Sequence, residues 1–261
     1  QRLLGDCYFI AAVSSLADHP ARIERLFTSH NLSHKGIYGV KLFIAGIWET
    51  VIIDDFLPFD PENKMRLAFS SCRDGSLWLS FLLKAWAKVF GGYLNISTGT
   101  TYEALVALTG APTGHYEIID CSASEHWSRL REATSLKFPI CASSKKFDRT
   151  NEHGIDIETG LTSTHAYSII DSYDVEIANK KEKVLKLRNP WGQDRFRGEW
   201  AKGSRKWSPS LEAAMGVDWT SRGIFFMTLA EFIENFHSYN IAMVIDTNST
   251  TCAKLSTPSD T

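Results

Sequence analysis

Apolar residues recur at helical spacing over residues 6–18, near the start of the chain. These side chains share one face of a predicted helix, and Asp6 is a residue type that commonly occupies the N-cap. The segment 77–90 is apolar on nearly all sides, which predicts a buried helix that ends at Gly91 and Gly92. Similar patterns predict helices over residues 21–27 and 101–108 and a β-hairpin over residues 37–59.

Short runs typical of β-strands dominate the chain after about residue 115, with helices predicted only over 124–135 and 229–236. The predicted strands cover residues 138–144, 165–173, 183–190, 223–229 and 239–246. This change predicts an α+β fold in two parts. Residues 1–118 form a mainly helical part, residues 119–247 form a mainly antiparallel β part, and residues 248–261 form a polar linker or tail.

Composition excludes several classes of protein. The formal net charge of −2 gives no indication of a nucleic-acid partner or an anionic membrane, and no apolar stretch approaches the roughly 20 residues that cross a bilayer. Five widely spaced cysteines without a CxxC motif argue against a disulfide scaffold or a zinc site. We therefore expect a reducing, cytoplasmic or otherwise intracellular setting. Because Gln1 is not an initiator residue, we also expect flanking domains of a longer chain.

Cys7 is the first candidate for chemistry. A cysteine in an apolar helix is more often an inert core residue than a nucleophile. The position of Cys7 in the first helical turn favours a nucleophile over an inert core residue, because unpaired N–H groups and the helix dipole favour a thiolate there. A nucleophilic Cys7 would need a histidine to accept its proton.

His165 is the best placed of the eight histidines to accept that proton. It begins a predicted strand directly after the polar loop ETGLTST, so the strand would hold it rigidly at the mouth of a loop. Most of the other histidines lie in polar surroundings, where a solvated side chain is the usual state. His115, near the predicted boundary between the two parts, is an alternative.

The imidazole also needs an acceptor for its other ring nitrogen, and Asn189 is the candidate. If the two strands form a hairpin with its turn near residue 177, Asn189 lies directly opposite His165. Asp171 is about 20 Å along the strand, which is too far to contact the ring. The alternative is that Asn189 only starts the turn before a proline.

Trp191 and Gln1 complete the candidate site. The Trp191 indole could shield the hydrogen bond between asparagine and histidine from water, although most tryptophans are core residues. The Gln1 amide could stabilise an oxyanion together with the Cys7 N–H, although a glutamine at a chain start is usually a surface residue. Each signal is weak alone, and together they predict nucleophilic catalysis by a cysteine.

Six segments resemble motifs of the calpain-type cysteine proteases. QRLLGDCYFIAA resembles the family signature QGxLGDCWFLAA, and HAYSI and LRNPWG resemble its histidine and asparagine motifs. WETVIIDDFLPF, LWLSFLLKAWAKVFGGY and GIFFMTLAEFIENF resemble three further motifs. The resemblance implies a papain-like fold of two lobes with an active-site cleft between them. It implies Cys7 as nucleophile, His165 as general base and acid, Asn189 as orienting residue, Gln1 as oxyanion donor and Trp191 as shielding indole.

Typical calpain cores bind two calcium ions, but this chain departs from the family at the ligand positions. Positions that carry acidic ligands in the family hold Ser76, Arg195, Lys202, Arg222 and Ile224. Calcium prefers several oxygen ligands, usually carboxylates, and these positions no longer supply them. Three positively charged side chains near one pocket would also repel the ion. We expect no second-lobe site, a weak or absent first-lobe site, and no required cofactor; calcium binding is implied only by the resemblance.

A related hypothesis concerns the two arginines among these replacements. Arg195 or Arg222 would pair with a nearby acid, such as Asp194, Glu199 or Asp218, and would hold the loops closed without a metal.

Two smaller departures lie beside the predicted catalytic residues. Tyr8 replaces the tryptophan of the family and keeps an aromatic ring beside the thiol. Thr164 replaces the glycine before the histidine and could narrow the substrate channel.

These observations predict an intracellular calpain-like cysteine endopeptidase that hydrolyses protein or peptide substrates through a thioester acyl-enzyme. The alternative is a catalytically silent relative that acts as a protein-binding domain, a reading that the loss of calcium ligands favours. Acyl transfer of the transglutaminase type would use an aspartate as the orienting residue, so Asn189 argues against it.

Overall fold

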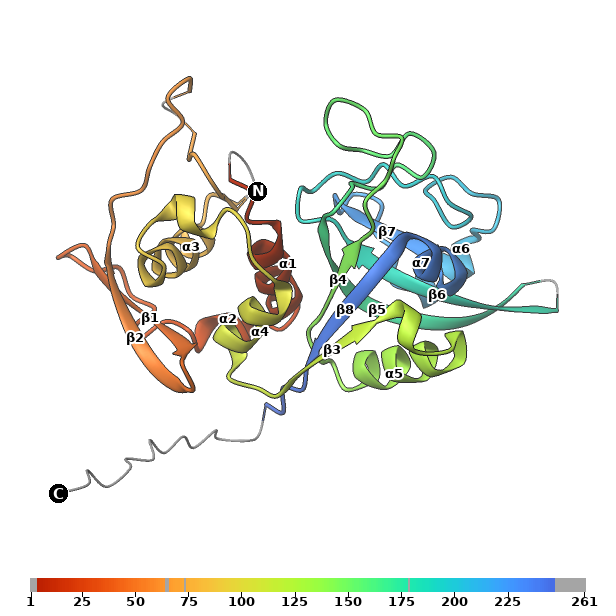
Figure 1. Cartoon of the computed structure of the whole chain (residues 1–261), viewed down its shortest axis with the longest axis horizontal. Helices are drawn as coiled ribbons and strands as arrows, with labels where there is room; N and C mark the ends of the chain where they lie inside the picture. The colour runs from red at the N-terminus through yellow and green to blue at the C-terminus, as the bar shows by residue number, and fades with distance from the viewer. Residues whose placement is uncertain (1–3, 64–65, 73, 178, 247–261) are drawn as a thin grey trace.

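The structure, a computed structural model, describes residues 4–63, 66–72, 74–177 and 179–246. These residues form two lobes, and the second lobe contacts two helices of the first, residues 7–17 and 101–109 (Figure 1). The first lobe is mainly helical and the second is built on an antiparallel sheet, which confirms the predicted α+β, papain-like arrangement. No helix in the described part of the chain is both long and apolar enough to span a bilayer.

The first lobe packs around α1, its most buried helix. Phe9 of α1 stacks on Trp86 of α3 with ring centroids 5.2 Å apart, and both side chains are buried. The hydrophobic patterns located α1 and α3 to within about one residue at each end. The elements of this lobe are α1 (Cys7–Ala17), α2 (Pro20–Glu24), α3 (Trp78–Val89), α4 (Thr101–Thr109) and the hairpin of β1 (Ile37–Ile44) and β2 (Ile47–Asp54).

The second lobe contains a six-stranded sheet of order β3-β8-β4-β5-β6-β7, in which all neighbours are antiparallel. The strands are β3 (Thr113–Glu117), β4 (Ile140–Ser144), β5 (Ala166–Ile177), β6 (Lys180–Arg188), β7 (Ile224–Thr228) and β8 (Phe236–Ala242). The helices are α5 (Ala123–Ser135), α6 (Pro209–Ala214) and α7 (Leu229–Asn235). The sequence does not predict β3 or α6, because β3 has no apolar alternation and α6 buries no side chain.

β3 changes the division between the lobes. It lies before residue 118, the predicted end of the first part, yet it pairs with β8 from Thr113 opposite Ala242 to Glu117 opposite Ser238. Residues 113–117 therefore belong to the sheet of the second lobe, because a partner distant in sequence recruits this short polar strand. The predicted tail 248–261 lies outside the described residues.

Hydrogen bonds from the second lobe fix α1 in place. Ser168 of β5 donates from Oγ to the carbonyl of Ala11 at 2.9 Å. Arg188, at the end of β6, donates to the Ser14 carbonyl at 3.1 Å and to Asp18 Oδ1 at 2.7 Å. These contacts set the position of α1 relative to β5 and β6.

Arg188→Met should lower the free energy of unfolding by about 2 kcal/mol, because hydrogen bonds to charged groups each contribute about 1.5–3 kcal/mol. Chemical denaturation of both proteins measures the difference. Arg205→Met, at an exposed position, is the matched control. Equal losses in the two variants would contradict a stabilising role for the contacts between Arg188 and α1.

Candidate active site

Cys7 begins α1 and lies at the junction of the two lobes. It is the first residue of the helix, with Asp6 at the N-cap. The backbone N–H of Ala166, the first residue of β5, lies close enough to its thiol to lower the thiol pKa. The thiol therefore faces the residue that directly follows His165. Gln1, predicted to act beside Cys7, lies outside the described residues.

His165 and Asn189 are hydrogen-bonded to each other. His165 Nε2 lies 3.1 Å from Asn189 Oδ1, and the residues are 3% and 8% exposed. The backbone N–H of Trp191 donates to the same oxygen at 2.9 Å. Because two nitrogen atoms converge on it, this atom must be the amide oxygen, and Nε2 must carry the proton. In the neutral ring, Nδ1 is then unprotonated and can accept a proton.

Aromatic rings cover the imidazole on two sides. The Trp191 indole lies with its centroid 4.6 Å from that of His165 and its plane tilted by 53°. The Tyr167 ring contacts the imidazole edge-on at 5.1 Å. This cover lowers the local dielectric around the bond to Asn189, which strengthens the bond electrostatically.

The hairpin that carries these residues differs from the predicted one. Its strands extend further, and the turn follows residue 177 instead of being centred there. A β-bulge in β5 then shifts the register so that Ser168 lies opposite Arg188. The prediction that Asn189 lies directly opposite His165 is therefore wrong. Continuing this register offsets the two residues by two positions, which keeps them on the same face of the sheet.

Gly223 fixes the backbone of Asn189 and was not singled out from the sequence. The Asn189 N–H donates to the Gly223 carbonyl at 2.8 Å. Gly223 has a φ of +80°, and a Cβ there would lie 2.7 Å from the Asn189 carbonyl oxygen. This position therefore requires glycine both for its conformation and for the close backbone contact.

Comparison with known proteins shows the family. The family described as "Calpain family cysteine protease" matches residues 1–243. The chain belongs to the calpain family. It is 32% identical to Calpain-14 of Homo sapiens over 242 residues, which are 90% of this chain and 34% of that protein.

Two further relatives show how much of a whole calpain this chain represents. It is 30% identical over 252 residues to the calpain-type cysteine protease ADL1 of Oryza sativa subsp. japonica, covering 94% of this chain and 11% of that protein. It is 29% identical over 247 residues to the Calpain-1 catalytic subunit of Rattus norvegicus, covering 92% and 34%. The chain thus spans about a third of these animal calpains and about a tenth of the plant protein.

Ser144 holds the backbone of the histidine in this calpain core, and sequence reasoning missed it. Its fully buried Oγ receives the His165 N–H at 2.9 Å and donates to the Thr162 carbonyl at 2.6 Å. Between Thr162 and His165, Thr164 adopts a φ of +48°, which is unfavourable for a β-branched side chain. The Thr164 N–H donates to the Lys145 carbonyl at 3.0 Å. The end of β4 therefore stabilises the strained turn that precedes His165.

Burial opposes charge on both the thiol and the imidazole. Burial raises the pKa of Cys7, an effect that the Ala166 N–H reduces. Burial also lowers the pKa of His165 to about 4, although the bond to Asn189 opposes this shift. The described residues show no hydrogen bond between the two side chains. Burial therefore favours the neutral form of both groups.

The positions that the resemblance assigns to second-lobe calcium ligands do not form an acidic site. Lys202 Nζ donates to the Trp219 carbonyl at 3.3 Å, and Ile224 is buried in a hydrophobic cluster. Arg195 and Arg222 are exposed. Among the residues that the structure describes, no group of three or more His, Cys, Asp or Glu side chains is placed to hold a metal ion.

In the first lobe, Ser76 occupies the position of an acidic family ligand. Its hydroxyl donates to Asp74 Oδ1 at 2.6 Å, and its backbone N–H donates to the same atom at 3.0 Å. The serine therefore closes a local turn.

The predicted pairs between the two arginines and nearby acids are wrong, because those acids have other partners. Glu199 Oε2 lies 2.5 Å from Lys206 Nζ. Asp218 accepts hydrogen bonds from the Thr220 hydroxyl at 2.6 Å and from its backbone N–H. Asp194 accepts a backbone N–H at 3.1 Å. Local turns and a lysine, not the arginines, therefore satisfy these carboxylates.

Ser144→Ala should lower kcat on a peptide substrate on the order of tenfold with little change in KM, because His165 loses its backbone anchor. It should also lower the free energy of unfolding by about 2 kcal/mol, since the buried His165 N–H loses its partner. Steady-state kinetics and chemical denaturation measure these effects. Ser143→Ala, at the half-buried neighbouring position, is the control. A change in KM alone, or matching effects in both variants, would contradict the positioning role.

His165 should make this calpain core sensitive to acid. Its pKa is about 4 in the folded state against an ordinary value of 6.5, so the unfolded chain binds the proton first as the pH falls. Stability should therefore be lost between about pH 6.5 and pH 4, by up to about 3 kcal/mol. Urea denaturation across this range should show a shallower pH dependence in His165→Gln than in the original protein. Identical slopes would contradict the low pKa of His165.

Proposed function

We propose that this chain is the catalytic core of a calpain-like cysteine endopeptidase, which hydrolyses peptide bonds by a Cys-His-Asn mechanism. One observation carries the proposal. The His165 Nε2–H and the Trp191 N–H both donate to Asn189 Oδ1, which leaves Nδ1 of His165 to accept the proton of Cys7. Asn189 thereby selects the tautomer that a general base needs.

In the first half of the reaction, Cys7 Sγ gives its proton to His165 Nδ1 and attacks the carbonyl carbon of the scissile bond. The imidazolium then passes that proton to the leaving amine as the C–N bond breaks, and a thioester remains on Cys7. In the second half, His165 accepts a proton from water, the hydroxide attacks the thioester, and the thiol is regenerated. Asn189 accepts the Nε2–H bond throughout.

The oxyanion of each tetrahedral intermediate needs donors in a fixed position. The Cys7 N–H lies in the first turn of α1, where backbone donors have no partner within the helix. The Gln1 side-chain amide is proposed as the second donor. These two groups would make the start of α1 both the source of the nucleophile and the site of charge stabilisation.

The proposed substrates are proteins or extended peptides, with no nucleic acid involved and no cofactor required. We also propose that the protein acts inside the cell and carries flanking domains, since its relatives are much longer. The four free cysteines of the described residues fit a reducing compartment.

A second candidate function is that of a catalytically silent, protein-binding calpain module. The depth of the site favours it, because His165 is only 3% exposed and burial disfavours the charged thiolate–imidazolium pair. Binding of substrate would have to change this environment before the nucleophile could form.

Labelling with a peptide epoxide that targets cysteine proteases tests the proposal. A thiolate opens the epoxide ring and forms a thioether, which adds the mass of one inhibitor molecule. The protein is labelled first with calcium chelated and then with calcium added, and intact mass is recorded over time. We expect rapid single labelling in chelator, because under this proposal only the Cys7 thiol has a histidine, His165, placed to accept its proton as the epoxide ring opens.

Cys7→Ala is the control and should remove the labelling. Labelling that requires calcium would overturn the calcium-independent form of the proposal. Labelling that persists in Cys7→Ala, or no labelling under either condition, would contradict catalysis by Cys7 and favour the binding module.

A further inference from the structure

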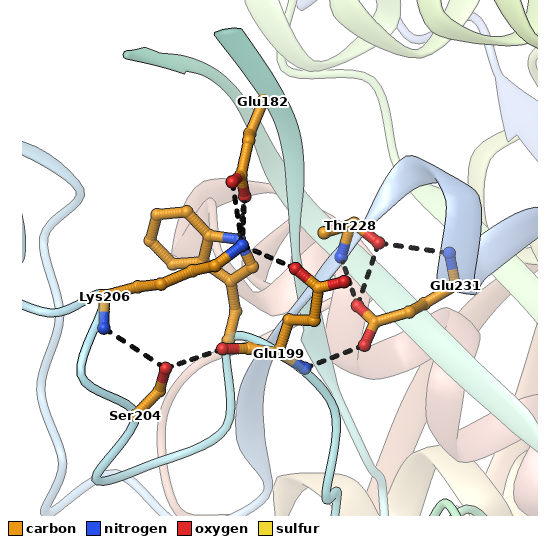
Figure 2. A network of polar contacts seen from close by, with 7 residues as sticks. Glu182, Glu199, Ser204, Lys206, Thr228 and Glu231 are labelled. Carbon is orange, nitrogen blue, oxygen red and sulfur yellow. Dashed lines mark hydrogen bonds and ion pairs between the residues drawn. The ribbon is translucent and has the colours of Figure 1, made fainter. Parts of the chain in front are cut away.

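A lysine ammonium joins two carboxylates in the second lobe. Lys206 Nζ lies 2.6 and 2.8 Å from the two oxygens of Glu182 and 2.5 Å from Glu199 Oε2 (Figure 2). The Lys206 and Glu182 side chains are 25% and 21% exposed, so water screens this pair less than an ordinary surface pair. Burial alone would lower the pKa of Lys206, but the two carboxylates outweigh it and raise that pKa.

This ammonium connects the loop formed by residues 193–207 to the sheet. Glu182 lies on β6, whereas Glu199 and Lys206 lie in loop 193–207. Trp200 of the same loop is fully buried, and its Nε1–H donates to Glu182 Oε2 at 2.8 Å. Glu182 therefore receives two donors from the loop, one charged and one neutral.

Loop 193–207 also contacts segments that lead to the catalytic residues. It follows directly on the Asn-Pro-Trp-Gly segment of the site. The Glu199 N–H donates to Glu231 Oε1 at 2.8 Å, at the start of α7 (Figure 2). The Arg197 N–H donates to the Thr159 carbonyl at 2.9 Å, in the segment that leads to His165. Loop 193–207 is therefore connected both to the segment that contains Asn189 and to the segment that leads to His165.

A divalent cation does not fit this region. The positions where the calpain resemblance expects second-lobe ligands hold Arg195, Lys202, Arg222 and Ile224. Calcium needs several oxygen ligands, and these residues supply three positive charges and an apolar side chain instead. The carboxylates of Glu182 and Glu199 already contact Lys206, and those of Asp194 and Asp218 accept hydrogen bonds within local turns.

We propose that the Lys206 ammonium takes the place of a bound cation in this calpain core. It neutralises and joins the carboxylates of Glu182 and Glu199, so that loop 193–207 folds without calcium. The inference concerns the folding of the loop and does not depend on the proposed peptidase activity.

Hydrogen exchange and thermal unfolding of the full chain, in chelator and in calcium, test this inference. In the original protein, exchange of peptides that cover loop 193–207 should be the same in both conditions. Lys206→Met leaves two carboxylates facing each other, so exchange in the loop should accelerate by about tenfold and Tm should fall by about 5 °C. Lys206→Arg keeps the charge and should stay closer to the original values.

Lys181→Met is the matched control, because it removes one exposed lysine from β6 next to Glu182. Lys206→Met behaving like this control would overturn the role of Lys206. If calcium slowed exchange in loop 193–207 of the original protein, the inference that a divalent cation does not fit this region would be wrong. If Lys206→Met does not fold, two measurements still test the proposal. The comparison of calcium with chelator in the original protein tests the calcium misfit, and the stability of Lys206→Arg tests the need for a positive charge at this position. None of these measurements depends on Cys7. A negative result for Lys206 can therefore be distinguished from a negative result for the proposed peptidase function, which epoxide labelling tests.

Discussion

The burial of α1 between the two lobes is the constraint on which the rest of the structure depends. The helix fills the core of the first lobe, and its first residue, Cys7, carries the thiol. The second lobe contacts the same helix through Ser168 and Arg188, which lie on β5 and β6. His165 directly precedes β5 and Asn189 directly follows β6, so these contacts position the Cys7 thiol relative to His165 and Asn189.

Burial has two opposite effects at this site. Exclusion of water strengthens the bond between His165 and Asn189, and the Trp191 indole adds to that exclusion. The same exclusion makes charge on Cys7 and His165 unfavourable, which favours the neutral form of both groups. The bond to Asn189 thus fixes the tautomer of His165. Burial, in contrast, disfavours a thiolate–imidazolium pair between Cys7 and His165 in the environment that this structure shows.

Charged residues in the loops of the second lobe illustrate how tertiary contacts decide pairing. Glu199 is followed by several cations along the sequence, and the structure pairs it with Lys206 while Lys202 donates to a carbonyl. The pair forms because Glu182 on β6 and the buried Trp200 hold the acids and the lysine in one place. Net charge and spacing along the chain are the same whichever pair forms, so they could not have selected it.

The order of the motifs and the periodicity of apolar residues were enough to predict the two-part α+β fold, the start of α1 at Cys7, and the two strands whose ends lie next to His165 and Asn189. These features depend on local propensity and on which face of an element is apolar, both of which are properties of the sequence. Only the tertiary structure decided the β-bulge that changes the register, the pairing of β3 with β8, and the contact of Ser144 with the His165 backbone. The pairing of β3 with β8 joins segments far apart in the chain, and the Ser144 contact joins two separate segments of the second lobe. The bulge lies within the β5–β6 hairpin, but the apolar pattern of that hairpin does not reveal it.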